Sequence, residues 1–141
     1  MDSLVKRIDH VGIAVPDLDE AIAFYERAFG IVKVHEEVNE AQGVREAMCQ
    51  VGDGDTMIQL LAPLSPESTI AKFIDRSGPG IQQMAYTVDD VVAVAAQLRE
   101  RGVRVLYDEP KIGTGGSLIN FAHPKDCGGV LVELVQPAAH H

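Results

Sequence analysis

Two stretches of the sequence decide the fold: IDHVGIAV at residues 8–15 and IQQMAYTV at residues 81–88. Both are rich in apolar residues that partly alternate with polar ones, which is typical of a β-strand with one buried face. The second stretch begins 73 residues after the first (81 − 8 = 73), and each is followed by an aspartate and a helical pattern. A repeat at this spacing determines how every other element of the chain is assigned.

The two helical patterns cover about residues 17–29 and 89–101. Each pattern has an aspartate at the expected N-cap and a glycine just past its end, Asp17 with Gly30 and Asp89 with Gly102. An N-cap carboxylate accepts hydrogen bonds from unpaired backbone N–H groups, and a glycine allows the left-handed conformation that ends many helices. These positions are offset by 72 residues (89 − 17 = 72), so Pro16 counts as an extra residue in the first copy.

Three further strands are expected after each helix. They are predicted at about 31–38, 43–51 and 56–62 in the first half, and at about 103–107, 117–122 and 130–136 in the second. The last pair matches well, since MIQLLAP at 57–63 corresponds to LVELVQP at 131–137. Between the halves, residues 65–80 predict a short helix and a Gly-Pro linker.

The sequence thus predicts an α+β fold of two tandem βαβββ modules, about 7–64 and about 80–137, joined by a linker at about 65–79. Each module is too small to bury both faces of a sheet. The modules are therefore expected to share one core in a single domain of residues 1–141, or to pair with another chain. A cleft between two curved, mixed sheets is the expected place for a metal-centred site.

The composition excludes several classes of partner. The formal charge is −9, from 21 acidic and 12 basic residues, which argues against nucleic acid and against an anionic membrane surface. No apolar run approaches the roughly 20 residues of a membrane-spanning helix, and no signal-peptide pattern opens the chain, so a cytoplasmic location is expected. Cys49 and Cys127 are expected as reduced thiols. His140 and His141 follow the last predicted strand and are not counted among the candidate site residues.

Four polar residues occupy matching positions in the two halves, where His10 pairs with Gln83 and Gln59 pairs with Glu133. Their neighbours two residues away are mostly apolar, so the side chains are expected on an inward face. Taken singly, a strand histidine is more often a packed or surface residue, and a strand glutamate more often lies on the solvated face. Together they predict two ligands from each half. Imidazole, amide and carboxylate groups suit a divalent ion such as Co, Mn, Zn, Ni or Mg.

Glu46 is a separate candidate, in QGVREAM at residues 42–48 on a predicted strand of the same sheet. The ordinary alternative is a surface carboxylate beside Arg45. Its approximate counterpart in the second half is Asn120 (46 + 74 = 120), which is not a carboxylate. If Glu46 is catalytic, the chemistry at this position is therefore one-sided.

The paired modules and their ligand positions resemble the vicinal oxygen chelate superfamily, and finer motifs resemble the methylmalonyl-CoA epimerases within it. These motifs are IDHVGIAV with PDLDEAIAFY (8–25), EAQGVREAM (40–48), IQLLAPLSPESTIAKFI (58–74), LRERGVRVLYDEPKIGTGGS (98–117) and INFAHPKDCGGVLVEL (119–134). The sequence departs from the pattern at Gln82 and Gln83, where many members carry His-His, and at Leu118, where many carry a cation. The amide of Gln83 is expected to weaken metal affinity and to favour harder ions.

This resemblance implies a metal-dependent epimerase that interconverts (2R)- and (2S)-methylmalonyl-CoA through a metal-stabilised enolate. It places the metal ligands, with Co²⁺ as the first choice of ion, on four residues: His10, Gln59, Gln83 and Glu133. Glu46 is implied as the general base that removes the C2 proton. Glu133 is a ligand first, and it is also a candidate for the second acid, with water or another group as alternatives. A homodimer and an acyl-CoA substrate are implied as well.

Two other functions stay open on the sequence alone. A glyoxalase-type isomerase would share the ligand set and differ in its substrate loops, and a small-molecule binding module of the same fold would need no metal. The CoA phosphates need cations, for which the candidates are Lys111, Lys125, Arg45 and Arg104, each also readable as an ordinary solvated residue. GTGGS at 113–117 suggests either a close approach of backbone to a ligand or a plain hairpin loop.

Overall fold

The computed structural model describes residues 3–139, so His140 and His141 lie outside the described residues. The chain forms two compact units. The N-terminal unit spans His10–Gln82, and the C-terminal unit joins the residues up to Asp9 with those from Gln83 onward. The first strand, β1 (Arg7–Ala14), therefore contributes to both units.

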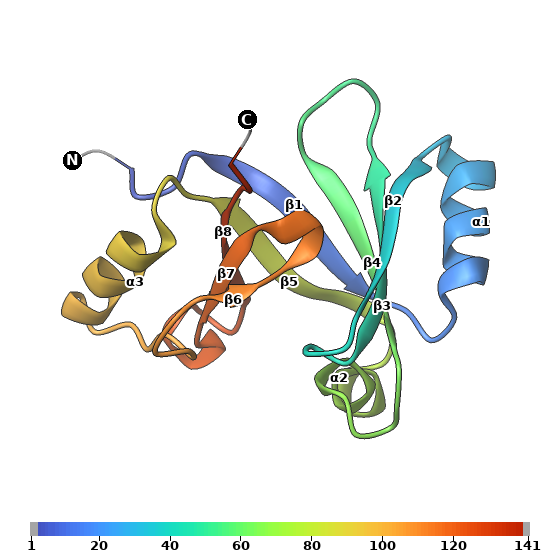
Figure 1. The fold of residues 1–141 in the computed structure, drawn as a ribbon. Coiled ribbons are helices and arrows are strands. Elements are labelled where there is room, and N and C mark those ends of the chain that lie inside the picture. The colour runs from blue at the N-terminus through green and yellow to red at the C-terminus, as the bar shows by residue number, and fades with distance from the viewer. Residues whose placement is uncertain (1–2, 140–141) are drawn as a thin grey trace. The chain divides into compact units, whose positions relative to one another are not determined.

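The N-terminal unit has a four-stranded sheet in the order β2-β3-β4-β1, in which β1 and β4 run parallel and the other neighbours antiparallel (Figure 1). Its further elements are α1 (Leu18–Phe29), β2 (Val32–Asn39), β3 (Val44–Gln50), β4 (Met57–Pro63) and α2 (Thr69–Ser77).

The C-terminal unit repeats this plan in the order β5-β8-β7-β6, with β5 and β8 parallel. Its elements are β5 (Gly80–Thr87), α3 (Val91–Glu100), β6 (Lys111–Ile112), β7 (Leu118–Ala122) and β8 (Leu131–Gln136). Both units follow the order βαβββ, which confirms the predicted α+β class and its internal repeat.

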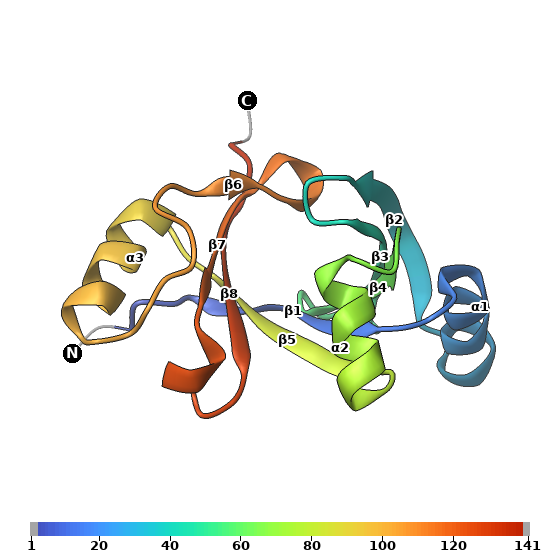
Figure 2. The same cartoon turned by 90° about the horizontal axis from the view of Figure 1, so that it is seen from below.

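One face of each sheet is covered by a helix. In the N-terminal unit, α1 packs through Leu18 on the face that carries Leu60 and Cys49, while α2 packs through Ile70 near one end of the opposite face (Figure 2). In the C-terminal unit, α3 packs on the face that carries Leu134. Because side chains alternate along a strand, the residues between these apolar positions project from the other face of each sheet.

The helix caps agree with the sequence at the first helix and correct it at the second. Asp17 caps α1 by accepting a hydrogen bond from the backbone N–H of Glu20 at 3.0 Å. The predicted cap Asp89 is wrong, because Asp90 has the extended backbone and accepts from the N–H of Ala93 at 3.1 Å. Asp90 follows Asp17 by 73 residues (90 − 17 = 73), the offset of the strands, so no extra residue precedes the first helix.

The strand predicted at 103–107 does not form. Leu106 donates its backbone N–H to the carbonyl of Phe121, but only Val105 makes an isolated β-bridge, with Ala122. The side chain of Asn120 then accepts from the N–H of Tyr107 at 3.1 Å and donates to its carbonyl at 3.0 Å. These bonds replace the next step of a strand ladder, so the chain turns away and pairs again only at β6.

We expect Asn120→Leu to lower the free energy of unfolding by about 2–4 kcal/mol, because it removes both hydrogen bonds between the buried Asn120 side chain and the backbone of Tyr107. Asn120 is 1% exposed. Asn39→Ala is the matched control, since Asn39 satisfies a single backbone N–H, that of Gln42, and should cost about 1 kcal/mol. Urea unfolding measures both variants, and equal losses would contradict the special role of Asn120.

Candidate active site

Three buried polar side chains lie on the face of the N-terminal sheet opposite α1. His10, Gln59 and Glu46 are each 3% exposed. In the parallel pairing of β1 with β4, His10 lies opposite Met57 and Gly12 opposite Gln59. His10 and Gln59 therefore project from the same face of neighbouring strands.

Glu46 is held by Gln59, whose amide Nε2 donates to its Oε2 at 2.9 Å. In the β3–β4 pairing, Met48 lies opposite Gln59 and Glu46 opposite Leu61, which puts Glu46 on the same face as Gln59. Glu46 is thus no surface carboxylate beside Arg45. Since the amide nitrogen of Gln59 serves the carboxylate, its amide oxygen is the atom suited to ligate a cation.

The C-terminal unit carries the matching pair, Gln83 and Glu133, each 6% exposed. Gln83 Nε2 donates to Glu133 Oε1 at 2.8 Å. Gln83 lies opposite Leu131 and Ala85 opposite Glu133, the same register that His10 and Gln59 have in the other unit. The structure therefore places the four predicted ligands in two equivalent pairs, one in each unit, on the sheet faces opposite α1 and α3.

The equivalence also corrects the counterpart of Glu46. Glu133 lies opposite Phe121, and Val135 lies opposite Ile119, so Ile119 takes the position of Glu46 in the second module. The predicted counterpart Asn120 lies one residue further and therefore faces the side of the sheet that α3 covers. The asymmetry is sharper than predicted, because a carboxylate in one module stands where the other has a buried isoleucine.

The cations expected for the CoA phosphates mostly have partners within their own unit. Arg45 lies on the α1 side and bonds Asp19 at 2.8 Å and Glu36 at 2.7 Å. The hydrogen bonds from Arg45 lower the pKa of both carboxyls. Arg104 bonds Asp126 at 2.9 Å and lowers the pKa of that carboxyl to about 2. These two arginines therefore stabilise the fold locally.

Of the remaining two candidates, Lys111 places its Nζ 4.1 Å from the centre of the Tyr107 ring, and Lys125 is exposed. The GTGGS segment is a tight 3-10 turn between β6 and β7, in which Gly115 and Gly116 have φ of 65° and 80°. A Cβ at Gly113 would lie 2.7 Å from Ile119 Cγ2. The hairpin itself therefore requires these glycines, which favours the plain-loop alternative.

The donor atoms in each pair are of kinds that bind divalent cations. They are an imidazole nitrogen, two amide oxygens and a carboxylate oxygen, all on buried side chains. Within residues 3–139, no three His, Cys, Asp or Glu side chains gather as a metal-binding group. The candidate set contains only two such residues, with glutamines in the other two places. This composition is richer in oxygen than a typical zinc site and favours harder ions.

Comparison with known proteins defines the class first. Residues 9–121 match the family model of the Glyoxalase/Bleomycin resistance protein/Dioxygenase superfamily. Across the described part of the chain, no helix has the length and apolar content that crossing a membrane requires.

The more similar proteins narrow this class. Human mitochondrial methylmalonyl-CoA epimerase is 41% identical over 134 residues, which cover 92% of this chain and 73% of that protein. The crystal structure of methylmalonyl-CoA epimerase from Mycobacterium tuberculosis is 54% identical with a TM-score of 0.95, covering 99% of this chain and 93% of that one. A methylmalonyl-CoA epimerase in complex with methylmalonyl-CoA and NH4+ is 50% identical with a TM-score of 0.93 over 97% of each chain. The chain therefore belongs to the glyoxalase superfamily and, within it, to the methylmalonyl-CoA epimerase family.

Proposed function

We propose that this chain is an epimerase that interconverts (2R)- and (2S)-methylmalonyl-CoA by removal and return of the C2 proton. The observation that carries the proposal is the buried Glu46, fixed by Gln59 on the same sheet face as His10. A related epimerase of known structure holds methylmalonyl-CoA, which supports an acyl-CoA substrate here.

Glu46 acts as the general base. The hydrogen bond from Gln59 orients its carboxylate, and the burial of Glu46 keeps bulk water from competing for the proton. Ile119 at the equivalent position of the other module offers no second base there. Among the described residues, Glu133 is the other buried carboxylate on the sheet faces opposite α1 and α3, and it is the proposed second acid as well as a ligand.

The proposed metal ligands are His10, Gln59, Gln83 and Glu133. A divalent ion held by these residues would supply positive charge to stabilise the negative charge that develops on the thioester oxygen. Glu133 contributes the one anionic ligand, and Gln83 donates a hydrogen bond that orients it. Co²⁺ is the proposed ion, ahead of Mn²⁺, Zn²⁺, Ni²⁺ and Mg²⁺. A homodimer in the cytoplasm is the proposed state and location.

The direct test is deuterium wash-in at C2 of methylmalonyl-CoA in D₂O, followed by mass spectrometry with each divalent ion added in turn. We expect exchange well above the uncatalysed rate with at least one ion. Absence of exchange with all of them would overturn the proposal. A glutathione hemithioacetal serves as the comparison substrate, because turnover of that compound alone would favour a glyoxalase-type isomerase.

A further inference from the structure

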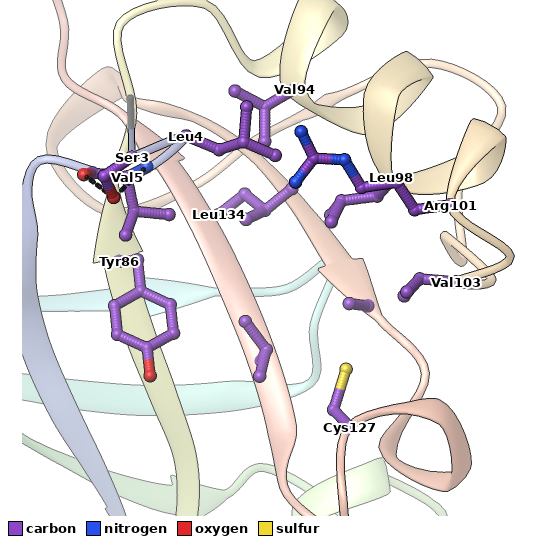
Figure 3. Close-up of a pocket in the computed structure, with 12 residues that line it drawn as sticks. Ser3, Leu4, Val5, Tyr86, Val94, Leu98, Arg101, Val103, Cys127 and Leu134 are labelled. Carbon is purple, nitrogen blue, oxygen red and sulfur yellow. Dashed lines mark hydrogen bonds between the residues drawn. The ribbon is translucent and has the colours of Figure 1, made fainter. Parts of the chain in front are cut away.

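An apolar pocket lies in the C-terminal unit under α3, on the side of the sheet opposite Glu133 (Figure 3). Its volume is about 440 Å³, within the range of about 300–1,000 Å³ that small-molecule sites occupy. Val132 and Leu134 of β8 line it from the sheet, and Val94 and Leu98 line it from α3. Because side chains alternate along β8, this lining is separate from the face that carries Glu133.

Arg101, just after α3, is the one cation among the described residues that line this pocket. Figure 3 shows its side chain extending beside Leu98 along the pocket. Among residues 3–139, no acidic side chain forms an ion pair with Arg101. The nearby carboxylates have other roles, since Asp89 pairs with Lys6 at 2.9 Å and Asp90 caps α3. The pocket therefore combines an apolar wall with one guanidinium that forms no ion pair with any residue in the described part of the chain.

We propose that this pocket binds an aliphatic carboxylate of medium chain length, with the chain on the apolar lining and the carboxylate on Arg101. Apolar side chains such as Leu134 offer no hydrogen bonds, so a ligand can place a polar group only near the few polar lining residues. A guanidinium presents paired N–H donors that match both oxygens of a carboxylate. The site is independent of the epimerase proposal, since it uses none of the residues assigned to that reaction.

Cys127 also lines the pocket and reports on its occupancy. Cys127 is partly exposed, whereas Cys49 is 0% exposed. The rate at which the folded protein is alkylated is therefore the rate of reaction at Cys127. Burial, with a smaller contribution from Asp126, raises the pKa of the Cys127 thiol, so the labelling is run at about pH 8.5. We expect decanoate to slow the reaction of Cys127 with N-ethylmaleimide in a saturable way, and calorimetry to give the same dissociation constant.

Variants test separately the contact of the carboxylate with Arg101 and the contact of the aliphatic chain with the apolar lining. Arg101→Gln should weaken decanoate binding at least about tenfold and leave decanol binding unchanged, because only the charged head group is affected. Leu98→Trp should fill the pocket and remove the protection. Arg27→Gln is the matched control, since Arg27 occupies the last turn of α1 in the other unit, and it should bind decanoate like the parent chain.

Three results would overturn the proposal. Millimolar decanoate could leave the alkylation of Cys127 unchanged, in which case no such site exists. Decanoate could bind Arg101→Gln as tightly as the parent, which would place its carboxylate elsewhere. Alkylation could instead slow with rising protein concentration and ignore decanoate, which would mean that a second copy of the chain covers the pocket.

Discussion

Glu46→Gln is expected to slow deuterium wash-in at C2 of methylmalonyl-CoA by about 100- to 10,000-fold, the usual contribution of a positioned general base. The substitution is nearly isosteric, and the amide oxygen can still accept the 2.9 Å hydrogen bond that Gln59 donates to Glu46. What it removes is the ability to take up a proton. Metal affinity should stay within about threefold of the parent value, since Glu46 is not a proposed ligand.

The control for this variant is Glu37→Gln. Glu37 lies directly opposite Glu46 on the neighbouring strand β2 and therefore on the same face, but its side chain is 30% exposed and bonds His35. If burial and the bond from Gln59 make the base, Glu37→Gln should exchange deuterium at close to the parent rate. Near-normal exchange in Glu46→Gln would remove Glu46 from the role, while leaving the epimerase proposal to be judged on the parent enzyme.

The elements of the fold could be predicted because local patterns mark them. Alternation placed the first strand at 8–15, against Arg7–Ala14 in the structure, and an aspartate and a glycine marked both ends of the first helix. The strand predicted at 103–107 failed for a tertiary reason. Asn120 is 13 residues from Tyr107 in sequence, and its competition with the ladder depends on the folding of β7.

Single-residue register was the part that could not be predicted. An alignment of the two modules assumes one sequence offset between equivalent residues. Each helix or loop can be one residue longer or shorter in one module, which changes that offset. A slip of one residue moves a strand side chain to the opposite face. That is why Asn120 was paired with Glu46 in place of Ile119, and why Asp89 was chosen in place of Asp90.

The sequence identified the buried polar residues of the candidate site, but it did not predict the hydrogen bonds that they form. The sequence matches Gln59 with Glu133, but the bond from Gln59 to Glu46 requires the antiparallel register of β3 with β4. The same holds for Arg45, whose partner Asp19 lies 26 residues away on α1. A cation next to a candidate base in sequence points to the other face of the strand, so it belongs to a different environment.

Glu133→Gln is expected to lower the affinity for Co²⁺ at least about 100-fold, because it removes the one carboxylate from the proposed ligand set. Glu133 is buried and accepts a hydrogen bond from Gln83 Nε2 at 2.8 Å, a contact that an amide oxygen at position 133 can keep. Calorimetry and the visible absorption of Co²⁺ measure this affinity without reference to turnover. Deuterium wash-in should fall with it at any Co²⁺ concentration that saturates the parent.

Two further variants complete this test: one is expected to raise the affinity for Co²⁺, and the other is a control that should leave it unchanged. Gln83→His should raise Co²⁺ affinity about tenfold, since imidazole is the better ligand for a borderline ion. Glu109→Gln removes an exposed carboxylate from the same unit and should change nothing, which separates ligation from net charge. Unchanged affinity in both Glu133→Gln and Gln83→His would remove the C-terminal pair from the metal site. Loss of metal in Glu133→Gln but not in Glu46→Gln would assign metal ligation to Glu133 and leave Glu46 as the carboxylate that removes the C2 proton.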